Sequence, residues 1–92
     1  MQSIRGGYIM SKLSKAKERL RQQPKGYTWD EACSLVRTLG FKKVEGSGSR
    51  VKFFNPESGD LISLHKPHPR NVMKPYAIKD LYRFLNERGL LK

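Results

Sequence analysis

The spacing of apolar residues changes at Phe41, and this change limits the folds that the chain can adopt. In the segment before it, YTWDEACSLVRTLG, apolar residues recur at the spacing of a helix. After it, apolar and polar residues alternate, which indicates three short antiparallel strands at residues 41–45, 50–55 and 60–66. A sheet of this kind must cover one face, so the sequence predicts an α+β two-layer sandwich, with helices on one face of a three-stranded antiparallel sheet.

The predicted helices on either side of the strands have clear ends. Thr28 and Glu31 form an S/T-x-x-E capping box at the start of the first of them, and Gly40 follows its last apolar residue. Pro75 suits the first turn of the closing helix, which ends before Gly89. The core of the fold therefore reads helix, three strands, helix.

The segment before this core is basic. Residues 1–10 lack periodicity and are expected to be a flexible tail. Residues 11–26 are expected to form a short basic N-terminal helix and linker, and residues 27–92 the main domain. The basic helix is either a contact for nucleic acid or a partner, or a solvated element, and we favour the latter.

The chain has a large excess of positive charge, which indicates an acidic partner. Nineteen Lys and Arg against eight Asp and Glu give a formal charge of +11. Nucleic acid is the commonest partner of a small basic domain, because each neutralised phosphate releases counterions. No apolar run is long enough to span a membrane, and no signal-peptide core is present, so we expect a cytoplasmic protein without a membrane partner.

Polar side chains gather on one face of the predicted sheet. With NPESGD as the hairpin turn, Arg50 lies opposite His65 and Lys52 lies opposite Ser63, with Phe54 beside them. A basic, aromatic surface next to a Gly-Ser loop suits an RNA strand. The alternative is that these are ordinary solvated strand residues.

Both histidines of the chain lie in the segment HKPHP, at the end of the third strand. Prolines stiffen this segment. Because imidazole titrates near neutral pH, His65 and His68 are the first candidates to move a proton on RNA. The alternative is that they are loop histidines that only form hydrogen bonds.

Neither metal nor cofactor chemistry is expected from the sequence. Cys33 is alone and lies within an apolar helical pattern, which predicts a buried thiol rather than a reactive one. Glu57 and Asp60 lie in a turn and form no carboxylate cluster for a metal ion.

Residues 27–90 resemble the HicA family of type II toxin-antitoxin systems. The shared features are a helix ending in LGF, a Gly-Ser before the second strand, a His-Pro after the third, then a Lys-Pro and a closing helix with a glycine near its end. The resemblance implies a fold like double-stranded RNA-binding domains and a ribosome-independent ribonuclease activity on mRNA that inhibits translation and growth. It also implies neutralisation by a HicB-like antitoxin that covers the active site.

The chain departs from this family after the Gly-Ser, where typical members carry a histidine taken as catalytic. Here the residues are Gly48, Ser49 and Arg50, and arginine stays protonated and cannot act as a general base. One interpretation is a relative that binds RNA or the antitoxin without cleaving. The other, which we favour, moves proton transfer to His65 or to His68, while Arg50 holds the scissile phosphate.

The predicted site therefore combines catalytic and RNA-binding residues. The catalytic candidates are His65, His68 and Arg50. The residues predicted to bind RNA are Ser47, Ser49, Arg50, Lys52, Phe54, Lys66, Arg70 and Lys74.

Overall fold

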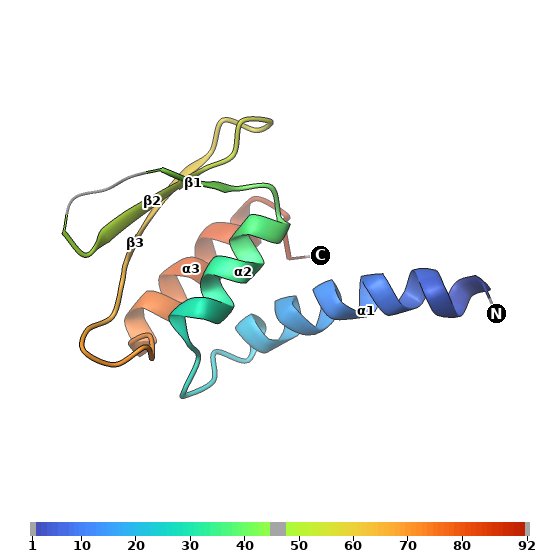
Figure 1. Ribbon diagram of the computed structural model, residues 1–92, viewed down its shortest axis with the longest axis horizontal. Coiled ribbons are helices and arrows are strands. Elements are labelled where there is room, and N and C mark those ends of the chain that lie inside the picture. The colour runs from blue at the N-terminus through green and yellow to red at the C-terminus, as the bar shows by residue number, and fades with distance from the viewer. Residues whose placement is uncertain (1, 45–47, 92) are drawn as a thin grey trace.

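A computed structural model describes residues 2–44 and 48–91 and shows an α+β fold (Figure 1). Its strands form an antiparallel sheet in the order β1-β2-β3, and helices α2 and α3 cover one face of it. This confirms the predicted fold class and the helix, three strands, helix order of the core. The elements are α1 (Gln2–Arg21), α2 (Trp29–Thr38), β1 (Lys42–Val44), β2 (Arg50–Phe54), β3 (Leu61–His65) and α3 (Pro75–Glu87).

Helix α2 begins at the predicted capping box. The Thr28 hydroxyl accepts a hydrogen bond of 3.1 Å from the backbone N–H of Glu31, and the Glu31 carboxylate accepts one of 2.9 Å from the N–H of Thr28. After the helix, Gly40 has a φ of 102°, a conformation that favours glycine. The chain can therefore turn directly from the helix into the sheet.

The register of the β2–β3 hairpin is the predicted one. Arg50 pairs with His65 and Lys52 pairs with Ser63. The two strands are each shorter at the turn than expected, because Asn55 and Asp60 belong to the turn itself, with a 2.8 Å hydrogen bond from the Asn55 N–H to the Asp60 carbonyl. Alternate residues of both strands are buried, so one face of the hairpin belongs to the core.

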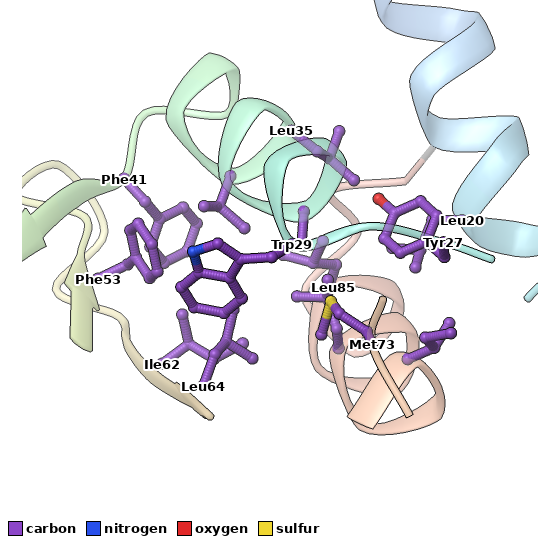
Figure 2. Close-up of a cluster of buried hydrophobic side chains, with 14 of the residues drawn as sticks. Leu20, Tyr27, Trp29, Leu35, Phe41, Phe53, Ile62, Leu64, Met73 and Leu85 are labelled. Atoms are coloured by element: carbon purple, nitrogen blue, oxygen red, sulfur yellow. The ribbon is translucent and has the colours of Figure 1, made fainter. Parts of the chain in front are cut away.

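The core lies between the sheet and the two helices (Figure 2). The ring of Trp29 at the start of α2 tilts against that of Phe53 on β2, with 6.3 Å between their centroids. Phe41 meets the edge of Phe84 from α3 at 6.2 Å. Aromatic contacts thus join each helix to the sheet region.

Helix α1 is longer than expected and is partly docked. Residues 2–10 are helical instead of forming the expected tail, because a helix, once nucleated, extends at one hydrogen bond per residue. Its end packs on the core, where Leu20 is fully buried, so this helix is not solvated on all sides. Among the described residues, no helix has both the length and the apolar character needed to cross a membrane.

An ion pair between Arg19 and Glu31 connects α1 to α2. Burial tends to raise the pKa of Glu31, but the hydrogen bonds from Arg19 and Thr28 outweigh it and hold this pKa below its ordinary value. The guanidinium of Arg19 also lies over the ring of Tyr27, 5.9 Å from its centroid. One glutamate therefore both caps α2 and holds α1.

Candidate functional site

The face of the sheet turned away from the helices carries three rows of exposed side chains. The rows, from the hairpin turn onward, are Lys42 with Phe54 and Leu61, then Val44 with Lys52 and Ser63, then Arg50 with His65. The first row has the two apolar side chains Phe54 and Leu61, which are 38% and 51% exposed. The open face therefore changes from apolar at the hairpin turn to cationic at its other end.

Arg50 and His65 contact each other at this cationic end. Nη2 of Arg50 lies 3.5 Å from Nε2 of His65. A guanidinium can only donate, so a hydrogen bond in this contact uses the lone pair of Nε2 as its acceptor. The strands remain paired just beyond, where the Lys66 N–H donates to the Ser49 carbonyl at 2.7 Å. The two side chains therefore project from a well-paired end of the hairpin.

A cavity of about 210 Å³ brings the two histidines together. Its walls come from the end of β3, the proline-rich segment after it and the first turn of α3. His65 and His68 line it with Lys66, Lys74 and Tyr76, and the Tyr76 side chain is largely exposed. Two histidines and two lysines therefore give the cavity a basic lining, which suits a small anionic group.

The segment that carries His68 is anchored to the start of α2. Thr28 and Val72 form an isolated antiparallel bridge, with hydrogen bonds from Trp29 to Asn71 at 2.9 Å and from Met73 to Tyr27 at 2.8 Å. The Met73 side chain is buried. These contacts fix the position of the segment relative to the sheet, and the His68–Pro69 peptide bond within it is cis.

The structure brings most of the predicted residues to the two parts of this site. Arg50, Lys52, Phe54 and His65 share the open face, and Lys66, His68 and Lys74 join His65 in the cavity. Ser49 is exposed beside Arg50, whereas Arg70 is exposed on the loop and does not line the cavity. Ser47 lies outside the described residues.

Tyr76 was missed by the sequence reasoning. The sequence signal that could have identified it is an aromatic residue directly after Pro75. This residue does not belong to the apolar side of α3, which Ile78, Leu81 and Leu85 form. An aromatic ring at an exposed helix start has no role in the core and can stack on a base.

Cys33 is half-buried rather than fully buried. Burial raises the pKa of its thiol above the ordinary value, and the nearby cations Arg37 and Lys43 only partly oppose this. The thiol form is therefore favoured at neutral pH. In the described part of the chain, no three His, Cys, Asp or Glu side chains are grouped to hold a metal ion.

Comparison with known families identifies the chain. No curated protein and no solved structure matches it. A sequence model described as the HicA toxin of bacterial toxin-antitoxin systems matches residues 29–87, which is more than half of the chain. The match runs from the first residue of α2 to the last residue of α3 and so contains the sheet, both covering helices and the histidine cavity. The protein therefore belongs to the HicA toxin family.

Proposed function

We propose that this toxin binds mRNA and cleaves it by metal-independent ribonuclease chemistry, which inhibits translation and growth. The observation that carries the proposal is the contact of Arg50 with His65, because His65 also lines the cavity that His68 lines. It places a fixed positive charge and two imidazoles at one end of a basic sheet. These are the groups that phosphodiester cleavage through the ribose 2′-hydroxyl requires.

The reaction needs one base, one acid and a cation at the phosphate. A phosphate that binds Arg50 displaces its contact with His65 and frees the Nε2 lone pair, which then takes the proton of the 2′-hydroxyl. The 2′-oxygen forms a bond to phosphorus while the bond from phosphorus to the 5′-oxygen breaks. His68 donates a proton to this leaving oxygen, and the guanidinium of Arg50 stabilises the negative charge that builds on the phosphate.

The surrounding side chains can position the strand. The exposed rings of Phe54 and Tyr76 offer stacking platforms for bases, and Lys52 and Lys74 offer charges for phosphates. The predicted contacts of Ser47, Ser49 and Arg70 remain part of this proposal. Its protein partner would be a HicB-like antitoxin that covers the same site in the cytoplasm.

The purified protein is expected to cut a transcript in the presence of EDTA. The fragments should end in a 2′,3′-cyclic phosphate on one side and a 5′-hydroxyl on the other, because the attacking group is the 2′-hydroxyl. Mass spectrometry of the fragments identifies these ends. RNA that is shifted in a native gel but stays intact would instead support the second candidate function, a non-catalytic module that binds RNA or its antitoxin. The arginine at position 50, where typical family members carry a histidine, is the observation that favours this candidate.

The Arg50→Ala variant is expected to bind RNA more weakly and with a smaller dependence on salt. One lost phosphate contact on a single strand reduces the slope of log affinity against log salt concentration by about 0.7. Fluorescence anisotropy with a labelled oligonucleotide, at several salt concentrations, measures this slope. Arg83→Ala is the matched control, since Arg83 is exposed on α3 and lines no part of the site. A slope equal to that of the unmodified protein would show that Arg50 does not contact a phosphate.

A further inference from the structure

A second and larger cavity lies beside the histidine cavity. It has a volume of about 680 Å³ and opens between α2 and the sheet, and Lys66 lines both cavities. Its lining is mostly polar and includes Cys33, which the proposed reaction does not use. The size lies within the range of ligand sites in proteins, about 300 to 1,000 Å³.

Three cationic residues from separate parts of the chain line this second cavity. Arg37 comes from α2, Lys43 from β1 and Lys66 from the residue after β3. The cavity has one carboxylate, Asp30, which accepts a 3.1 Å hydrogen bond from the Asn71 amide. None of the ion pairs formed by described residues includes the three cations. The cavity therefore has an excess of positive charge, because three cationic residues line it against one carboxylate.

We propose that this basic cleft, defined by Arg37, Lys43 and Lys66, binds the sugar-phosphate backbone of single-stranded RNA next to the bond that is cut. The inference rests on the proposed function, because it continues the strand from the histidine cavity past Lys66. A single backbone fits a cleft of this volume, so we expect the strand bound there to be single. The chain thus has a single-strand site on the helix side of the sheet, in addition to the open face.

The chemistry of the cleft favours RNA over an acidic segment of a protein. A peptide segment needs apolar pockets for its anchoring side chains, whereas the cleft offers little apolar surface and its Trp29 side chain is buried. Phosphates need cations and hydrogen-bond donors, and the lining of the cleft supplies both, since the hydroxyl-bearing Ser34 lines it together with the cations. Continuity with the histidine cavity is the second reason.

Cys33 provides a direct test, because it is the only cysteine of the chain and lines the cleft. Its rate of alkylation by iodoacetamide, an uncharged reagent, is measured with and without saturating 2′-O-methyl RNA of about 12 nucleotides, within the usual site sizes for single strands. This RNA lacks the attacking hydroxyl and stays intact. We expect it to slow alkylation at least several-fold. An unchanged rate while anisotropy shows bound RNA would overturn the cleft proposal and leave the proposed function standing.

A pair of matched double variants tests the charges. Arg37→Gln with Lys43→Gln should reduce the slope of log affinity against log salt by about 1.4, which corresponds to two phosphates, and should remove the protection of Cys33. Lys79→Gln with Arg83→Gln removes the same charge from exposed positions on α3 outside both cavities, and should change neither. Equal slope changes in the two variants would mean that only net charge matters and would overturn the proposal.

Two further outcomes separate the remaining explanations. Protection of Cys33 by a poly-glutamate peptide but not by RNA would assign the cleft to an acidic protein partner, and the proposal would be wrong. If the unmodified protein binds no RNA at all, the proposed function fails together with the cleft proposal. RNA binding without protection, in contrast, contradicts only the cleft.

Discussion

The His65→Ala variant is expected to lose RNA cleavage almost completely while its RNA affinity stays within a few-fold of that of the unmodified protein. General-base catalysis by a positioned imidazole contributes about 10² to 10⁴ in rate, and the alanine cannot accept the 2′-hydroxyl proton. Arg50, on the paired strand, would still hold the phosphate. The single-turnover rate at saturating RNA, measured in EDTA, separates the chemical step from binding.

Two companion variants make this result specific to proton transfer. His68→Ala should reduce the rate by a similar factor if it supplies the acid. Arg50→His in the His65→Ala background should restore only part of the rate. The imidazole returns to the facing position across the hairpin, but the cation that Arg50 supplies to the phosphate is lost. Unchanged cleavage in His65→Ala would remove His65 from the mechanism, and His68 alone would remain as a candidate.

The part of the candidate site that lies on the open face of the sheet could be predicted, because it depends on the residue pattern within one hairpin. Alternation fixes which strand residues share a face, and the turn length fixes their register, so the pairing of Arg50 with His65 followed from the sequence. The capping box of α2 is equally local, since its two residues lie within one helical turn.

The two cavities could not be predicted, because they depend on contacts between distant parts of the chain. The position of His68 relative to Tyr76 is set where Thr28 bridges Val72, and no local pattern encodes that pairing. The basic cleft likewise depends on how α2 packs beside β1, because only this packing brings Arg37 and Lys43 to the lining of one cavity. The length of α1 was not predicted for another reason. Gly6 and Gly7 have a low helix propensity, but the helix formed by the residues after them extends through both glycines.

The Phe53→Ala variant is expected to lower the free energy of unfolding by about 3 to 5 kcal/mol. Phe53 is fully buried on β2 and contacts Trp29, so its removal leaves a cavity between the sheet and α2. Small domains are stable by only about 5 to 15 kcal/mol, which makes this loss a large fraction of the total. Urea denaturation followed by the fluorescence of Trp29, the only tryptophan, measures the loss.

Phe54→Ala is the matched control, because it removes the same side chain from the next residue of the same strand. Phe54 lies opposite Leu61 on the open face, and an exposed cross-strand pair of this kind contributes about 0.2 to 1 kcal/mol. Its stability should therefore change little, whereas its RNA affinity should fall by about 1 to 3 kcal/mol, the usual contribution of one stacked base. If Phe54→Ala lost much stability and Phe53→Ala lost little, the assignment of the buried and open faces of the sheet would be wrong. The Arg50–His65 pair would then point into the core, where two polar groups without further partners could not form an RNA site.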